Sequence, residues 1–203
     1  EHRSLIYQRA KSVRDTTPFG TKLDVYAPGY EWVNHSLQAR HVDASNMRIT
    51  IGGPDCKQPY SCSLLNISAM SFGSLSMNAI LALSRGAKLG GFAHNTGEGG
   101  LSPYHLEGGG DLIWQIGTGY FSCRDENGNF SPKLFAEKAA IPNVKMIEIK
   151  LSQGAKPGHG GILPAAKVTA EIAKIRKIQT GAQVDGITGG LSVKEEDKKV
   201  EDK

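Results

Sequence analysis

Short apolar runs alternate with amphipathic stretches along most of the chain. Residues 64–70 form a continuous apolar run typical of a buried strand. Three further short strands are expected at residues 91–96, 112–117 and 146–152, and the last of them, which contains Lys150, is expected to be apolar on both faces. Three further segments repeat apolar residues at helical spacing: residues 76–90, 132–140 and 164–177. Strand, loop and helix therefore recur in order, and this rhythm predicts an α/β fold built from βα units around a parallel sheet.

Local signals place the ends of the expected helices. Ser76 is a typical N-cap for the first helix, and Gly90 is expected to end it. Pro164 suits the first turn of the last segment. Because that segment, 164–177, has the clearest apolar face, it is predicted to form one continuous helix.

The two ends of the chain differ from its middle. Residues 1–63 are predicted to form an N-terminal α+β extension, with weak helical periodicity over 3–14 and a short β-rich run at 47–51. Residues 64–191 contain the βα units. Residues 192–203 carry nine charges in twelve positions without apolar periodicity, which predicts a disordered tail.

Composition excludes several classes of function. The 203 residues suit one domain, and a net charge of +4 is too small to predict nucleic-acid binding. No apolar run approaches the roughly 18–20 residues of a membrane span. Cys56, Cys62 and Cys123 lack CxxC spacing, so neither a disulfide framework nor a metal site is expected. This cysteine usage fits a reducing cytoplasm.

Glycine accounts for 25 residues, and many glycines gather in loops that follow the expected strands. Three such loops read NTGEGG (95–100), GTGYF (117–121) and QGAKPGHGG (153–161). Ligands bind at the carboxyl ends of parallel strands, so these loops are expected to meet in one site. NTGEGG is suited to cradle an anion or a flavin edge, but an ordinary glycine-rich turn explains it as well.

The segment from Lys150 to Gly161 combines positive charge with a glycine-fixed path. Lys150 lies within or just after an expected strand, and Gln153 and Lys156 follow on the loop. These side chains suit an anionic ligand or an electron-rich ring, although surface lysines on a loop are an equal alternative. His94 and His159 have no sequence partner for a catalytic triad.

Five of these segments, taken in order, closely resemble the FMN-binding synthase domain of glutamate synthases, and most of all its single-domain branch. They are ISAMSFGSLS (67–76), HNTGEGG (94–100), QIGTGYF (115–121), IEIKLSQGAKPGHGG (147–161) and LPAAKV (163–168). Residues 9–36 are similar to the leader segment of that branch, so the resemblance covers about residues 1–177.

The resemblance implies a (β/α)₈ TIM barrel with FMN at the carboxyl ends of the strands. It also implies a glutamate synthase-like oxidoreductase that takes part in ammonia assimilation. Reduced FMN would deliver electrons to 2-iminoglutarate, which forms from 2-oxoglutarate and ammonia, and the product is glutamate. The expected partners are a 2-oxoglutarate-like small anion and an electron-donor protein or subunit.

The resemblance also assigns roles to individual residues. Ala69, Met70, Ser71, Thr96, Gln115 and Lys150 correspond to flavin-binding positions. Gln153, Lys156 and Arg176 correspond to positions that contact the carboxylates of 2-oxoglutarate. Lys150 and Lys156 are the expected catalytic residues, since a fixed ammonium stabilises the negative charge of reduced flavin. Arg176 has an alternative role as a cation at the end of the last helix.

Three positions depart from the family pattern. Asn78 stands where the family has an acidic residue, and PGHGGILP replaces PGEGGQLP, so His159 and Ile162 replace a glutamate and a glutamine. An aliphatic side chain cannot donate a hydrogen bond to a carboxylate. The departures leave open an FMN-dependent barrel that acts on a different carbonyl, imine or hydroxy acid.

The length of the family-like region sets a further expectation. A (β/α)₈ barrel typically needs about 250 residues, whereas only about four βα units fit between Leu64 and Arg176. Residues 64–191 are therefore expected to form the first half of the barrel. An iron–sulfur cluster is expected only in a full-length parent. A third hypothesis is an inactive truncated chain that holds FMN weakly and associates with itself.

Overall fold

The computed structural model describes residues 2–14, 20–151, 153, 161–181 and 184–185. Lys156, His159 and the expected disordered tail, 192–203, lie outside the described residues. Contacts divide the chain into two compact units, Glu1–Val42 and Asp43–Lys203.

The described part of the first unit contains one helix, α1 (His2–Ala10), which buries none of its residues. This helix agrees with the weak periodicity of the sequence. Across the described residues 20–42 the chain forms no helix or strand. Tyr26, Val33 and Leu37 are almost fully exposed there, and the rings of Tyr30 and Trp32 stack at 6.3 Å.

The second unit begins with an antiparallel hairpin. A 3₁₀ turn, η1 (Ala44–Asn46), precedes β1 (Arg48–Ile51), which pairs in register with β2 (Tyr60–Ser63). The expected strand at 47–51 is thereby confirmed. The sequence did not single out β2 as a strand.

The predicted strand at 64–70 is wrong. Leu64 and Leu65 are exposed, and only Ile67 forms a bridge, parallel to His94. The physical reason is the side chain of Asn66, which donates to the carbonyl of Ser63 at 2.7 Å and accepts from Ala93 N–H at 2.9 Å. An asparagine that bonds the backbone on both sides turns the chain instead of extending it.

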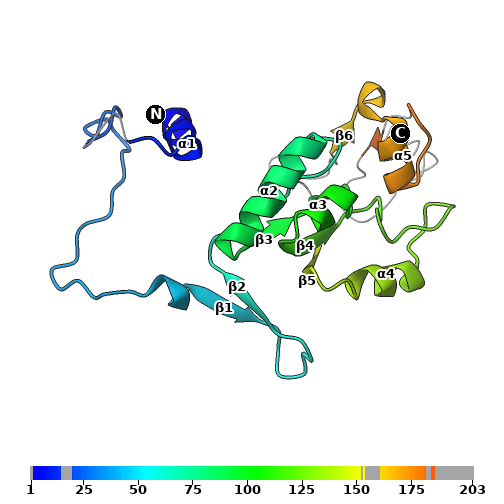
Figure 1. Ribbon diagram of the computed structural model, residues 1–203, viewed down its shortest axis with the longest axis horizontal. Helices are drawn as coiled ribbons and strands as arrows, with labels where there is room; N and C mark the ends of the chain where they lie inside the picture. The colour runs from blue at the N-terminus through cyan, green and yellow to red at the C-terminus, as the bar shows by residue number, and fades with distance from the viewer. Residues whose placement is uncertain (1, 15–19, 152, 154–160, 182–183, 186–203) are drawn as a thin grey trace, which may run out of the picture. The chain divides into compact units, whose positions relative to one another are not determined.

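A parallel sheet lies at the centre of the second unit (Figure 1). It consists of β3 (Ala93–Asn95), β4 (Asp111–Ile116) and β5 (Val144–Ile149), in the order β3-β4-β5. The connections carry α3 (Pro103–Glu107) and α4 (Pro132–Ala139), and α2 (Met77–Gly90) precedes β3. The expected α/β class with a parallel sheet is confirmed. Neighbouring strands also follow one another in sequence, with no reversal of order among the described strands.

Capping explains where the helices begin. Ser76 accepts from Ala79 N–H and starts α2, while Gly91, at φ 66°, ends it in the left-handed conformation. The predicted continuous helix over 164–177 is wrong: a 3₁₀ turn, η2 (Ala165–Lys167), precedes α5 (Ala170–Arg176). Thr169 has an extended backbone, and its hydroxyl accepts from Ile172 N–H. Its capping role therefore separates the two helical pieces.

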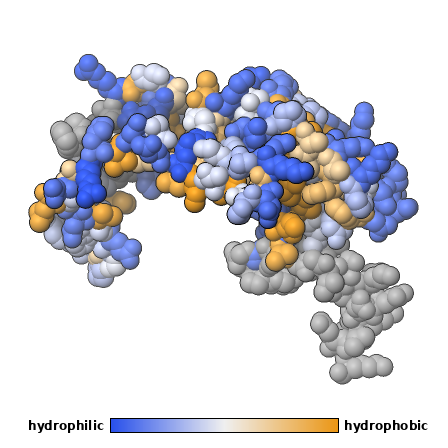
Figure 2. All heavy atoms as spheres, turned by 90° about the horizontal axis from the view of Figure 1, so that it is seen from below, coloured by the Kyte–Doolittle hydropathy of each residue, from blue (hydrophilic) through white to orange (hydrophobic). Residues whose placement is uncertain are grey.

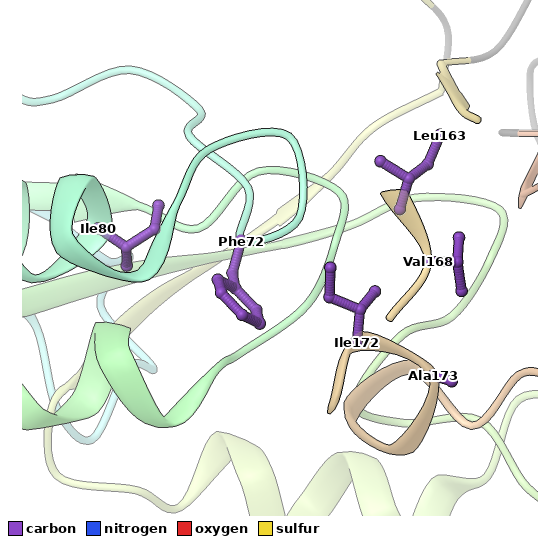
Figure 3. Packing of buried hydrophobic residues seen from close by; sticks show 6 residues of the cluster. All are labelled: Phe72, Ile80, Leu163, Val168, Ile172 and Ala173. Atoms are coloured by element: carbon purple, nitrogen blue, oxygen red, sulfur yellow. The ribbon is translucent and has the colours of Figure 1, made fainter. Parts of the chain in front are cut away.

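Two groups of apolar side chains form the core. The first joins the segment after Ile67, α2, α5 and β6 (Ile162–Leu163), and β6 pairs antiparallel with β7 (Val184–Asp185). Figure 3 shows its buried members: Phe72, Ile80, Leu163, Val168, Ile172 and Ala173. The second lies between β4 and α4 and contains Leu101, Leu112, Trp114, Ile116 and Cys123.

Strand β5 is more exposed than its apolar sequence predicts. The expectation of a strand buried on both faces is wrong, since Ile149 is 71% exposed and Ile147 and Leu151 are also exposed. Within the described part of the chain β5 pairs on one side, with β4. Figure 2 shows apolar side chains, in orange, that reach the surface of the molecule. No helix among the described residues has the length and apolar character needed to cross a membrane.

His94 is a buried ionisable group in β3, between β4 and the bridge at Ile67. Its ring is fully buried and lies 5.1 Å from the ring of His105. Neither of its ring nitrogens has a hydrogen-bond partner among the described residues. Burial, together with the neighbouring His105, lowers the pKa of His94 to about 4, and burial also lowers the pKa of His105.

We therefore predict that acid destabilises the fold through His94. Between its ordinary pKa of 6.5 and about 4, the unfolded chain protonates His94 and the folded chain does not. The free energy of unfolding should fall as the pH drops through this window, by on the order of 3 kcal/mol at about 1.4 kcal/mol per pKa unit. Urea unfolding at several pH values measures the slope. His94→Leu should flatten it, and His41→Gln, at an exposed histidine, should not. An unchanged slope in His94→Leu would contradict the prediction.

Candidate functional site

A small cavity opens at the carboxyl end of the parallel sheet. Its volume is about 60 Å³, and the loops after Ile67, β3 and β4 line it together with β6 and α5. Ser71, Glu98, Gly117, Phe121, Ile162 and Arg176 are among its lining residues. Thr96 and Lys150 directly follow β3 and β5, which are parallel to β4, so both lie at this same end of the sheet. The expected convergence of the strand-end loops is confirmed for their described residues.

Arg176 brings a buried positive charge to this cavity. It is the last residue of α5 and is 5% exposed. Its Nη2 donates to the carbonyl of Phe72 at 2.8 Å, and its guanidinium lies 5.1 Å from the centre of the Phe121 ring. Burial lowers the pKa of Arg176, and the charge of Glu98 partly opposes this. A role limited to the helix dipole does not explain a guanidinium that lines a cavity.

Among the described residues, the Arg176 guanidinium has no close carboxylate. In the described ranges, no Asp or Glu oxygen forms an ion pair with it within 4.0 Å. A buried charge is costly unless a partner compensates it. The cavity beside Arg176 is therefore suited to an anion.

Glu98 connects the residues around the cavity. Its Oε2 lies 3.2 Å from the Lys150 ammonium, and Gln153 Nε2 donates to its Oε1 at 3.1 Å. These contacts join the loop after β3 to the segment after β5. Glu98 was not among the residues predicted from the sequence, although an acidic residue inside the glycine-rich loop NTGEGG was the available signal.

Two glycines of this loop permit close packing. Gly97 has φ 65°, and a Cβ there would lie 2.9 Å from the backbone nitrogen of Ser71. A Cβ on Gly99 would lie 2.6 Å from Nη2 of Arg176. Side chains at either position would push Ser71 or the guanidinium away from the cavity.

Strained backbone holds Phe121 against Arg176. Tyr120 and Ser122, which flank Phe121, have φ values of 51° and 76°. Left-handed conformations at residues other than glycine cost of order 1–3 kcal/mol and concentrate at functional sites. The hydroxyl of Ser122 accepts from Leu101 N–H at 2.8 Å and ties this turn to the end of NTGEGG.

Thr96 and Gln115 belong to a second polar group on the sheet. Thr96 is fully buried, and its hydroxyl accepts from the backbone N–H of Gln115 at 3.1 Å and donates to Gly97. The Gln115 amide donates to Glu148, which also accepts from Asn95 at 3.1 Å. The amide oxygen of Gln115 is buried without a partner in the described structure. Glu148 was not predicted from the sequence either.

The remaining expected site residues lie near these two groups. Ser71 lines the cavity, and Met70 offers its carbonyl to the His105 ring, with Nε2 at 3.0 Å. Ala69 and Asn78 are exposed. Lys156, assigned to both catalysis and substrate binding, is outside the described residues.

The sequence from 33 to 187 matches the family model for a conserved region in glutamate synthase. The chain belongs to the glutamate synthase family. The expected resemblance is therefore confirmed, and the match contains both polar groups described above.

Individual relatives agree with this membership. The glutamate synthase large subunit-like protein YerD of Bacillus subtilis is 50% identical over 137 residues, which cover 66% of this chain and 26% of YerD. The archaeal-type glutamate synthase [NADPH] of Thermotoga maritima is 44% identical over 114 residues, 56% of this chain and 20% of the relative. The archaeal glutamate synthase [NADPH] of Methanocaldococcus jannaschii is 33% identical over 153 residues, which cover 75% of this chain and 27% of the relative. The chain thus spans about a quarter or less of the length of these relatives.

The packing of Gly99 against Arg176 generates a prediction. Gly99→Ala should displace the guanidinium and lower the free energy of unfolding by about 1–3 kcal/mol, as overpacking does. Gly86→Ala is the matched control, because nothing lies within 4 Å of a Cβ at this position in α2. That change should instead raise stability by about 0.5–1 kcal/mol. Urea denaturation compares the two variants, and equal effects would contradict the packing argument.

Proposed function

We propose that these residues form part of an FMN-dependent oxidoreductase of glutamate synthase type, which converts a 2-oxo acid and ammonia into an amino acid. The observation that carries the proposal is the buried guanidinium of Arg176 beside a cavity that Glu98 also lines. A 2-oxo acid presents a carboxylate next to its reactive carbonyl carbon. Such a molecule supplies an anion to Arg176, which has no ion-pair partner among the described residues, and brings the reacting carbon toward the strand ends.

The arrangement of the sheet supports a (β/α)₈ barrel. The Ile67 bridge, β3, β4 and β5 are parallel neighbours in sequence order. A barrel needs this order, whereas doubly wound sheets reverse it at a switch point. Residues 64–191 are then the first half of the barrel, with the site at its carboxyl end.

The second polar group fits an isoalloxazine ring. The buried amide oxygen of Gln115 has no partner in the described structure and can accept from a ring N–H. Lys150, whose side chain is 24% exposed, places an ammonium at the end of β5. We propose that Gln115, Thr96, Lys150 and the backbone of 69–71 hold FMN. When bound, FMN supplies the two electrons of the reduction.

The residues of the chain bind and orient the substrate. Arg176 binds and orients the carboxylate. Glu98 faces the nitrogen that replaces the carbonyl oxygen, and the Lys150 ammonium holds the Glu98 carboxylate in place. In the first step, the 2-oxo acid and ammonia give the imino acid and water. In the second step, the imino acid takes up two electrons and two protons and becomes the amino acid. Gln153 orients Glu98, and Lys156 is proposed to bind the substrate from the loop after β5.

A cytoplasmic location and an electron-donor protein or subunit complete the proposal. A second candidate function is an FMN-dependent oxidoreductase that acts on a different acid substrate. It is favoured by one observation: Ile162, an aliphatic residue, lines the cavity.

Lys150 provides a test of the flavin site. In the flavin-loaded protein at its natural length, Lys150→Met should lower the midpoint potential of FMN, because the reduced flavin loses a compensating charge. A shift of about 30 mV corresponds to a tenfold change in a two-electron equilibrium. Spectroelectrochemical titration measures the potential. Lys133→Met, at an exposed position of α4, is the control and should leave it unchanged. Equal potentials in all three proteins would refute the placement of Lys150.

The exposed face of β5 predicts the behaviour of residues 1–203 alone. Purified with FMN, this chain should retain little flavin after gel filtration, show no turnover and elute above the monomer mass, since exposed apolar surface drives association. Ile149→Lys should reduce the elution mass. Leu89→Lys, at a position of α2 that is 90% exposed, should not. A monomer that keeps stoichiometric flavin would overturn this prediction.

A further inference from the structure

His105 joins helix α3 to the segment after Ile67. The residue lies in α3 and is fully buried. Its Nε2 lies 3.0 Å from the carbonyl oxygen of Met70, and its Nδ1 lies 2.8 Å from the hydroxyl oxygen and 3.3 Å from the backbone nitrogen of Ser102. Because a carbonyl only accepts hydrogen bonds and a backbone N–H only donates them, Nε2 carries the ring proton and Nδ1 accepts. The lowered pKa of His105 keeps the ring in this neutral form at neutral pH.

The hydrogen bond from His105 holds one peptide unit that has no other hydrogen-bonded anchor in the described structure. The N–H of Met70 donates to the carbonyl of Asn95 at 3.1 Å. The carbonyl of Ser71 accepts from the N–H of Leu75 at 3.0 Å. These groups belong to the peptide units on either side. The unit between Met70 and Ser71 can still rotate about its two Cα atoms, and among the described contacts the hydrogen bond from His105 prevents this.

The backbone N–H of Ser71 is the other polar group of this peptide unit. The Met70–Ser71 peptide is trans, so its carbonyl and its N–H point in opposite directions. With the carbonyl held at the His105 ring, the N–H points away from that ring. It has no hydrogen-bond partner among the described residues, and Ser71 lines the cavity at the strand ends. Backbone N–H groups are strong donors, so this one is available to a ligand.

We infer that His105 is a positioning residue of the flavin site, which holds the Met70–Ser71 peptide so that the Ser71 N–H donates to the isoalloxazine ring. The inference rests on the proposed function, in which the backbone of 69–71 holds FMN. His105 acts through the peptide that it orients and does not itself bind the flavin. Reduced flavin carries more negative charge than oxidised flavin, so it gains more from an N–H donor. His105 therefore raises both the affinity for FMN and its midpoint potential.

Two substitutions separate the two nitrogens of the imidazole. The amide oxygen of Asn takes the place of Nδ1, so His105→Asn retains the acceptor for Ser102 and loses the donor to Met70. The amide nitrogen of Gln takes the place of Nε2, so His105→Gln retains the donor to Met70 and loses the acceptor for Ser102. Ser102→Ala is the matched control, because it weakens the N-cap of α3 and leaves the contact with Met70 in place.

Flavin binding to the protein at its natural length tests the inference. Fluorescence titration with FMN measures the dissociation constant, and spectroelectrochemical titration measures the midpoint potential. His105→Asn should bind FMN about tenfold more weakly than the wild-type protein. Its potential should fall by about 30 mV, which corresponds to a tenfold greater loss of affinity for reduced than for oxidised flavin.

The two other variants show whether this effect is merely structural. His105→Gln and Ser102→Ala should lose thermal stability and yet keep the wild-type affinity and potential. Wild-type flavin properties in His105→Asn would overturn the inference. Equal losses in His105→Asn and Ser102→Ala would also overturn it, since a weakened helix cap would then explain both.

Hydrogen exchange gives a second readout that requires no variant to fold. In the wild-type protein at its natural length, the Ser71 amide should exchange at least tenfold more slowly once FMN is bound. An unchanged rate in the flavin-loaded protein would overturn the inference and leave the proposed function intact. A wild-type protein that binds no FMN would instead refute the proposed function, together with the inference that rests on it.

Discussion

The guanidinium of Arg176 has to remain charged inside the fold, and much of the surrounding structure accommodates it. The carbonyl of Phe72 accepts one of its hydrogens, and the face of the Phe121 ring lies below its charge. Gly73 and Gly99 leave room where a Cβ would meet Nη2. Strained backbone at Tyr120 and Ser122 keeps Phe121 in position. Arg176 therefore connects α5 to the loops after Ile67, β3 and β4.

The parallel sheet determines which loops can take part in this arrangement. Parallel strands direct all their carboxyl ends to one edge, so residues distant in the sequence become neighbours there. Glu98 follows β3 and Lys150 follows β5, 52 positions apart in the chain, yet their charged atoms lie 3.2 Å from each other. Strand β4, which lies between them, contributes Gln115 to the same region. The site therefore depends on strand order more than on any single motif.

Local signals in the sequence predict local structure well here. Ser76 and the glycines after residue 89 bracket α2 because capping involves only neighbouring backbone groups. The predicted strand at 64–70 and the predicted continuous helix at 164–177 fail at Asn66 and Thr169. Both side chains form hydrogen bonds with nearby backbone groups, and these bonds interrupt the element that the apolar pattern predicts. Periodicity reports only which positions are apolar, and it does not reveal side chains that compete for the hydrogen bonds of the backbone. The burial of Arg176 required long-range contacts with residues 72 and 121, so no spacing rule distinguishes it from an ordinary cation at a helix end.

The family resemblance found the residues whose motifs are long, and missed those whose role depends on geometry. Glu98 lies inside a recognised loop, but its importance appears only when its partners are known. It lines the same cavity as Arg176, yet its oxygens bind Lys150 and Gln153. Of these described charged groups, Lys150 pairs with Glu98, whose charge therefore compensates that of Arg176 only in part. The resulting local charge of about one positive unit favours an anion beside the guanidinium, and the Lys150 pair prevents Glu98 from taking that place.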